Sequence, residues 1–367
     1  MLTNIDILST FVNTTHNTMD NIFSKRLYNA RKMAGFSMDQ LASASGLSKN
    51  AISRYENGIM KPDSSNLIKL AKALNVKIDY FFRNSAVELH HVEFRKKSKL
   101  LKSQVESIKF RVLDQVERYL ELENILAINT QFVNPIEGIQ IRNSGDIEAV
   151  ADKVRHEWNI GQNPVPSVIE MLEDNHIKVV EVDEADDFDG LSSMIDGKIP
   201  VIVVNKNFIV ERKRFTLLHE LGHLLMKLPE DISVKEKEKM CHRFAGAFLV
   251  PLKRFISELG SKRTKILVDE LIPMQMEWGI SIKAIMQRAS DLGVITSSYL
   301  KQFYIRLNLT PSLKNKIDES RYSFVEKSYR FTQLLYKGIA QELVSLSKAS
   351  VLSNKPLNEL KTSLNYI

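Results

Sequence analysis

The chain has 367 residues, a length typical of two or three domains, and its hydrophobic content of 44% is enough for packed cores. No apolar run reaches the length of a membrane span, which excludes a membrane-spanning helix. The single cysteine, Cys241, excludes an internal disulfide and fits a reducing compartment. The net charge of +7 fits an anionic partner such as nucleic acid, although a charge of this size decides little by itself.

Residues 1–20 are polar and mixed in character. They lack the basic and apolar regions of a secretory signal peptide. We therefore expect a cytoplasmic protein. Residues 1–20 are expected to be an extension with a composition that permits disorder, and the alternative is that translation begins at Met19.

Residues 21–83 predict an all-α bundle of short helices separated by turn signals. Gly35 ends a first helix, and Ser37 and Ser48 can cap the second and third. The expected helices are 26–34, 38–45, 49–57 and one that carries Leu67, Leu70 and Leu74. A helix, a glycine turn at Gly46 and a second helix with a polar face form a helix-turn-helix.

The stretch SMDQLASASGLSKNAISRYENGIMKP, residues 37–62, resembles the Cro/C1-type (XRE) DNA-binding domains. The resemblance implies that the third helix enters the major groove of double-stranded DNA and that the protein binds as a homodimer. The residues expected to contact DNA are Lys49, Asn50, Ser53, Arg54, Asn57 and Lys61. Many relatives carry glutamine where this chain has Met38 and Lys49, so a phosphate clamp of paired glutamines is not expected. A bundle that makes only protein contacts is the alternative.

Residues 84–146 are expected to connect two domains. Apolar residues recur at helical spacing between His90 and Leu126, which predicts mainly one long amphipathic helix. Its basic beginning, which includes Arg95, Lys96 and Lys97, either contacts DNA or an acidic partner or is a solvated face. Its apolar stripe either packs on the next domain or pairs with a second subunit.

Residues 147–251 predict a small α+β domain. Helices are expected from Ile147 to Trp158 and from Val168 to Asn175, and a strand from Ile177 to Val182. A hairpin follows, with strands at 193–194 and 200–205 and a turn at Asp196-Gly197.

Next comes the stretch ERKRFTLLHELGHLLM, residues 211–226, which contains His219, Glu220 and His223 in the order H-E-x-x-H. The surrounding apolar residues predict a buried helix, on which residues four apart share one face. His219 and His223 can therefore bind one metal ion, with Glu220 beside it to take a proton from a water molecule. Gly222 would let another backbone approach closely. The alternative is a chance pattern with two hydrogen-bonded core histidines.

This region resembles the ImmA/IrrE family of zinc-dependent peptidases, which have a zincin-like fold. The similarity rests on Trp158, Gly161, Pro164 and the segments 188–191, 200–205, 214–225, 238–245 and 248–251. The family pattern E-x-x-[AC]-x-x-F-A implies that Glu238 is the third ligand of one catalytic Zn²⁺ per chain, with the fourth position open. Manganese or iron could also occupy such a site.

Three neighbours of Glu238 leave alternatives open. His242 stands where relatives carry Asn or Asp, so it is expected to orient a zinc-binding histidine from the second shell, or else to replace Glu238 as ligand. Glu236 and Cys241 are weaker candidates for the metal.

The strand Val201–Val204 could pair with an extended substrate by edge addition.

Residues 252–367 are expected to be helical. The segment 278–293 resembles the small helical part that follows the peptidase core in relatives. The last stretch, 329–364, looks like a further helix-turn-helix-type unit that serves packing, substrate gating or dimer contact.

The sequence thus predicts a mainly α chain: an XRE bundle, a connector, a peptidase domain and a helical C-terminal region. The expected function is that of a DNA-binding transcriptional regulator with a fused zinc endopeptidase that cleaves a repressor or antitoxin-like protein. The alternative is a repressor or antitoxin whose peptidase-like domain acts only as a sensor or partner-binding module.

Overall fold

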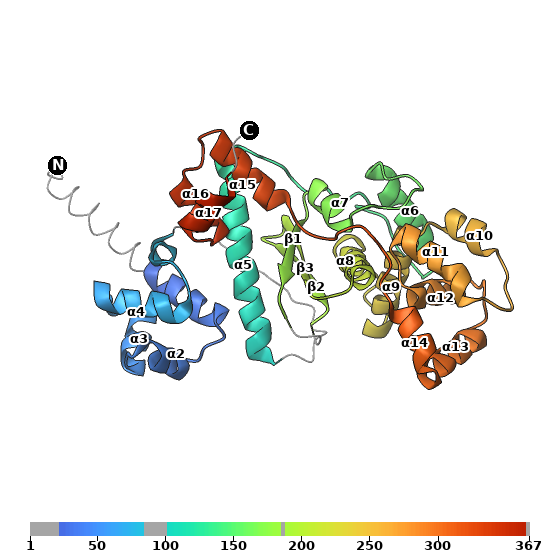
Figure 1. Ribbon diagram of the computed structural model, residues 1–367, viewed down its shortest axis with the longest axis horizontal. Helices are drawn as coiled ribbons and strands as arrows, with labels where there is room; N and C mark the ends of the chain where they lie inside the picture. Colours follow the sequence, from blue (N-terminus) through green and yellow to red (C-terminus); the bar gives the residue numbers. More distant parts are fainter. Residues whose placement is uncertain (1–21, 84–100, 185–187, 365–367) are drawn as a thin grey trace. The chain divides into compact units, whose positions relative to one another are not determined.

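The computed structural model describes residues 22–83, 101–184 and 188–364, and these fall into two compact units (Figure 1). The terminal unit comprises residues 22–83, 101–129 and 331–364, and the central unit comprises 130–184 and 188–330. The expected extension 1–20 and the basic segment that begins the connector lie outside the described residues.

A helical bundle forms the first part of the terminal unit. A helix at residues 22–33 is followed by α2 (Met38–Ser45), α3 (Lys49–Glu56), α4 (Ser64–Leu74) and the 3-10 helix η1 (Ile78–Phe82). The Ser37 and Ser48 side chains cap α2 and α3, and Gly46 ends α2 with a positive φ. The core includes the fully buried residues Leu27, Leu41, Ile52, Leu70 and Phe81.

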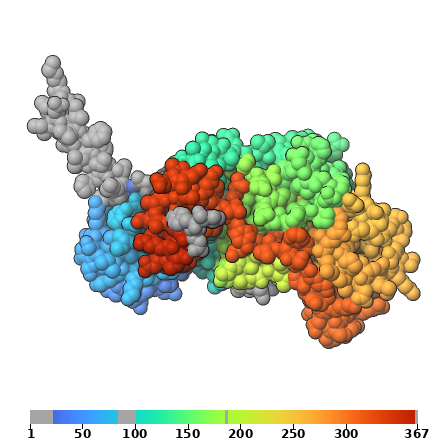
Figure 2. All heavy atoms as spheres, turned by 45° about the horizontal axis from the view of Figure 1, so that its top comes forward, coloured from blue at the N-terminus to red at the C-terminus, as the bar shows by residue number. Residues whose placement is uncertain are grey.

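The long helix α5 (Lys102–Ile125) completes the terminal unit together with α15 (Arg330–Ala340), α16 (Leu346–Ser353) and α17 (Leu357–Ser363). Leu122 of α5 shares an apolar cluster with Leu335, Leu352 and Leu360. The Lys77 ammonium donates to the Ser350 and Lys355 carbonyls, at 2.6 and 2.9 Å. Figure 2 shows the red surface of residues after 331 beside the blue surface of the bundle.

This grouping differs from the expected succession of segments at two places. Residues 101–129, expected in a connector, belong to the same unit as the bundle, and so do residues 331–364, expected in the C-terminal region. The reason is apolar burial, because α15–α17 cover the apolar face of α5 around Leu122.

The central unit contains a three-stranded sheet with the order β1-β3-β2. Strand β1 (Lys178–Val182) pairs parallel with β3 (Ile199–Asn205), and β2 (Gly190–Ile195) pairs antiparallel with β3. The β2–β3 turn has positive φ at Asp196 and Gly197, and its three residues, 196–198, connect the paired residues Ile195 and Ile199. The helices of the central unit are α6 (Ile147–Glu157), α7 (Val168–Asp174), α8 (Val210–Leu225), α9 (Val234–Leu249), α10 (Leu252–Leu259), α11 (Val268–Trp278), α12 (Ile282–Asp291), α13 (Ser297–Leu309) and α14 (Pro311–Asp318).

One apolar core extends through the central unit. It joins α8 and α9 to the sheet and also includes Trp278, Ile282 and Ile285 from α11 and α12. The expected fold class, mainly α with a small α+β domain, is confirmed. Among the described helices, none is long and apolar enough to cross a membrane.

Candidate metal centre

Helices α8 and α9 carry the predicted site and pack closely against each other. A Cβ atom at Gly222 would lie 3.2 Å from the Phe244 ring and 3.5 Å from the Cys241 Cα atom. The glycine in the middle of α8 therefore permits the close approach expected from the sequence, at a cost of about 1 kcal/mol in helix propensity. The first turn of α9 is fixed by a capping box between Ser233 and Glu236.

The side chains of His219, His223 and Glu238 converge at one point. The Nε2 atoms of His219 and His223 lie 3.1 Å apart. One Glu238 carboxylate oxygen lies 3.3 Å from His219 Nε2, and the other lies 3.4 Å from His223 Nε2. Two ligands of a tetrahedral zinc ion, each bound at about 2.0–2.1 Å, lie about 3.3–3.4 Å apart. These three side chains therefore fit a zinc ion with two histidine ligands and one carboxylate ligand.

Glu220 lies beside these ligands and is oriented by the sheet. Ser192 Oγ donates a hydrogen bond of 2.8 Å to Glu220 Oε2, and both side chains are buried. Ser192 belongs to β2, so the hairpin and α8 are both needed to aim the carboxylate. No motif in the sequence gave Ser192 a role. Its position two residues after Gly190, on the same face of the strand, is the signal that could have found it.

His242 contacts the site from α9. Its Nδ1 lies 2.7 Å from the Glu238 backbone oxygen, which can only accept, so Nδ1 carries the proton. Its ring lies 4.2 Å from the His219 ring, centroid to centroid, and stacks on Phe215. Ligand atoms of His219, Glu238 and His242 lie within 4.8 Å of one another. The shorter distances around Glu238 favour Glu238 as the third ligand and His242 as a supporting residue.

The two weaker metal candidates have other contacts. Cys241 is buried with Sγ 3.3 Å from His223 Nδ1, on the opposite side of that imidazole from Nε2. It therefore supports the ring orientation that directs Nε2 towards the metal position. Glu236 accepts hydrogen bonds from the Ser233 hydroxyl and backbone N–H, which lower the pKa of its carboxyl group. It caps α9 and does not face the metal position.

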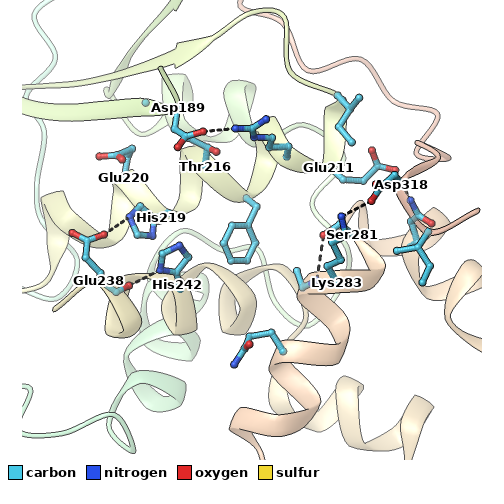
Figure 3. Close-up of a pocket in the computed structure, with 18 of the residues that line it drawn as sticks. Asp189, Glu211, Thr216, His219, Glu220, Glu238, His242, Ser281, Lys283 and Asp318 are labelled. Carbon is cyan, nitrogen blue, oxygen red and sulfur yellow. Dashed lines mark hydrogen bonds and ion pairs between the residues drawn. The ribbon is translucent and has the colours of Figure 1, made fainter. Parts of the chain in front are cut away.

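A cleft of about 740 Å³ opens at the metal centre and follows the N-terminal half of α8. Figure 3 shows His219, Glu220, Glu238 and His242 at one end, and Ser281, Lys283 and Asp318 at the other. Phe215, Val234 and Ile317 add apolar surface. Lys283 pairs with Asp318 at 2.5 Å, and Arg212 pairs with Asp189 at 2.5 Å. The charges along the wall are therefore largely neutralised in pairs.

The sheet edge beside the cleft is β2. The expectation that Val201–Val204 could pair with an extended substrate by edge addition is wrong. Those residues belong to β3, the central strand, whose two edges are occupied by β1 and β2. Gly190, at the start of β2, lines the cleft, and a Cβ atom there would lie 3.5 Å from Glu220 Cγ. Edge addition of an extended chain would therefore use β2.

The residues expected to contact DNA lie on or next to α3 in the terminal unit. Lys49, Asn50, Arg54, Asn57 and Lys61 are exposed, and Ser53 is half-buried. The Lys49 ammonium forms an exposed ion pair with Asp39 at 2.8 Å, and the Asn57 amide donates to the Ser53 carbonyl oxygen. The face of α3 opposite the buried Ile52 and Tyr55 is thus polar, as expected for a recognition helix.

Comparison with known proteins finds a family match in each of the two units. A family model described as helix-turn-helix matches residues 27–81, and one described as an IrrE N-terminal-like domain matches residues 173–290. The first match lies in the terminal unit and the second in the central unit, where it includes the candidate metal centre. The IrrE-like match continues beyond residue 251, the expected end of that domain, because α11 and α12 share its core.

Two curated relatives are similar over a shorter range. The chain is 35% identical over 63 residues to the HTH-type transcriptional regulator ImmR of Bacillus subtilis, and 33% identical over 64 residues to an uncharacterised HTH-type transcriptional regulator of Rickettsia conorii. Each match covers 17% of this chain, and the chain spans about half the length of these relatives (50% and 51%). No solved structure matches the chain significantly.

Proposed function

We propose that this protein is a DNA-binding transcriptional regulator whose IrrE-like domain is a zinc-dependent endopeptidase that cleaves a repressor or antitoxin-like protein. One observation carries the proposal. The Nε2 atoms of His219 and His223 and the Glu238 carboxylate lie at the spacing of tetrahedral zinc ligands, next to Glu220 and at the end of a long cleft.

The chain's own residues can then be given roles. A bound zinc ion would act as a Lewis acid on the peptide carbonyl and make water a stronger nucleophile. Glu220, oriented by Ser192, would take a proton from the attacking water and return it to the leaving amine. The edge of β2 would pair with the substrate backbone and hold it along the cleft. Cys241 and His242 would keep the metal-binding imidazoles in place.

The helix-turn-helix domain would bind duplex DNA through α3. The exposed side chains of Lys49, Arg54 and Lys61 supply positive charge for phosphates, and Asn50 and Ser53 can reach base edges. We expect a homodimer on paired half-sites.

The test compares the wild-type protein with Glu220→Gln, which keeps the size of the side chain and removes the base. Metal content is measured by mass spectrometry, and each protein is incubated with the product of the neighbouring gene and with a proteome-derived peptide library. About one zinc per chain in both proteins, with cleavage by wild type alone, is the expected result. Zinc in both without cleavage of either substrate would favour the alternative, a regulator or antitoxin whose IrrE-like domain binds a partner. Absence of zinc from both, even when it is supplied, would reject the enzyme.

A further inference from the structure

The segment 319–329 is extended rather than helical and runs along the central unit from α14 to the start of α15 (Figure 1). We call it the strap. Its beginning lies at the cleft, because Asp318 and Glu319 are among the cleft-lining residues. The strap is therefore continuous with the wall of the metal cleft, at the end opposite the metal.

The first anchor of the strap is Glu211 in the first turn of α8. Its buried carboxylate accepts hydrogen bonds from the Ser320 hydroxyl at 2.5 Å and from the backbone N–H groups of Arg321 at 2.9 Å and Tyr322 at 3.2 Å. Burial alone would raise the pKa of Glu211, but these hydrogen bonds outweigh it and the pKa is lowered. The carboxylate therefore stays ionised and ties three consecutive strap residues to the metal helix.

The second anchor is a buried ion pair between Arg214 of α8 and Glu326 of the strap, both with fully buried side chains. Glu326 also accepts the backbone N–H groups of Val168 and Ile169, at 2.9 and 3.0 Å. Arg214 donates further to the carbonyls of Val165 and Gly279. A buried ion pair of this kind tolerates loss of one partner poorly, because the other charge is left uncompensated.

Both anchors are on the helix that carries His219, Glu220 and His223. Arg214 precedes His219 by five residues, and Glu211 itself lines the cleft. The strap and the N-terminal half of α8 thus form one hydrogen-bonded wall, whose position is set by residues outside the H-E-x-x-H motif.

We propose that Glu326, acting through Arg214, is a positioning residue that sets the end wall of the peptidase cleft and thereby the affinity for the peptide part of a substrate. This inference rests on the proposed peptidase function. It assigns Glu326 no contact with the metal or with reacting atoms. Displacing the strap should weaken binding of a peptide while leaving binding of a metal-directed group unchanged.

The test uses two zinc-directed probes on the full-length zinc-loaded protein. Acetohydroxamate is expected to contact the metal alone, whereas a leucyl-leucine hydroxamate adds two apolar side chains for the cleft, whose lining includes Phe215 and Ile317. In Glu326→Gln, the affinity for the dipeptide hydroxamate should fall about tenfold, equivalent to about 1.4 kcal/mol, with acetohydroxamate affinity and zinc content unchanged. Lys327→Ala, an exposed strap residue, is the matched control and should change neither affinity.

A second variant covers the case in which Glu326→Gln fails to fold. Ser320→Ala removes one hydrogen bond to Glu211 at an exposed position and should lower dipeptide hydroxamate affinity about threefold, a smaller loss than for the buried charge. An equal fall for both probes, or no change for either, overturns the proposal. Failure of the peptidase function itself would be seen in the wild-type protein alone, which would then either bind no zinc and no hydroxamate or bind zinc without cleaving any substrate. Failure of the present proposal is seen only when the variants are compared with wild type.

Discussion

Glu173, at the end of α7, is buried beside the strap, and burial raises the pKa of its carboxyl group from 4.5 to about 7 despite a hydrogen bond of 2.6 Å from Ser328. A raised carboxyl pKa means that the folded state favours the protonated form. The contribution of Glu173 to stability is therefore fully present below pH 4.5 and is lost as the pH rises through about 7. Glu173→Gln should imitate the protonated form at every pH.

The magnitude follows from the two pKa values. One unit is worth about 1.36 kcal/mol, so the penalty for ionising Glu173 is about 1.4 kcal/mol at pH 5.5 and about 3.4 kcal/mol at pH 8.5. Relative to wild type, Glu173→Gln should therefore become more stable by about 2 kcal/mol when the pH is raised from 5.5 to 8.5.

Urea unfolding followed by tryptophan fluorescence measures this effect selectively. The two tryptophans of the chain, Trp158 and Trp278, both belong to the central unit, so the signal reports unfolding of that unit alone. Glu170→Gln, on the exposed face of α7, is the matched control and should show no such pH dependence. A stability difference between Glu173→Gln and wild type that is the same at both pH values would refute the reasoning.

Three further predictions test the two domains. Glu238→Ala should lower zinc affinity by more than about 100-fold, because about 100-fold is the largest loss typical of a residue that only supports a metal ligand. Cys241→Ala should lower zinc affinity by about tenfold, because Cys241 contacts His223 and not the metal position. Competition with a chromogenic chelator measures both affinities, and equal losses would contradict the assigned roles. Gly222→Val should destabilise the central unit by about 1–3 kcal/mol, because the added atoms meet Phe244 and the Cys241 backbone; an unchanged urea midpoint would show that α8 and α9 can separate freely. Arg54→Ala should weaken binding to the DNA upstream of the gene by about 1–3 kcal/mol in fluorescence anisotropy, whereas Lys72→Ala on the exposed face of α4 should have little effect; similar losses would indicate charge attraction alone.

Local spacing predicted which side chains come together at the candidate metal centre, whose metal binding stays a prediction. His219 and His223 are brought together by helix geometry alone, and the family pattern located Glu238 on the next helix, where the structure brings its carboxylate to both imidazoles. Boundaries fixed by local signals, such as the Ser37 cap and the Asp196-Gly197 turn, also agree with the structure. Such features depend on a few neighbouring residues and can therefore be read from sequence.

Features that depend on distant partners were missed. Strand order is set by which strands meet in space, so Val201–Val204 could not be recognised as central. The strap has no helical or strand periodicity, and the Glu326 carboxylate is held by Arg214, which is 112 residues away, and by backbone N–H groups of α7. The apolar stripe of α5 was visible as a helical spacing pattern, but nothing local showed that α15–α17 cover it.

The division of the terminal unit between two distant parts of the chain has a consequence for its biosynthesis. At about 5–20 residues per second, the roughly 200 residues of the central unit separate the emergence of α5 from that of α15 by about 10–40 s. During that interval the apolar face around Leu122 lacks the helices that cover it, and Lys77 lacks its acceptors in α16. A nascent chain would thus complete its central unit before its terminal unit, and ribosomes that stall in between would leave an exposed apolar helix for chaperones to recognise.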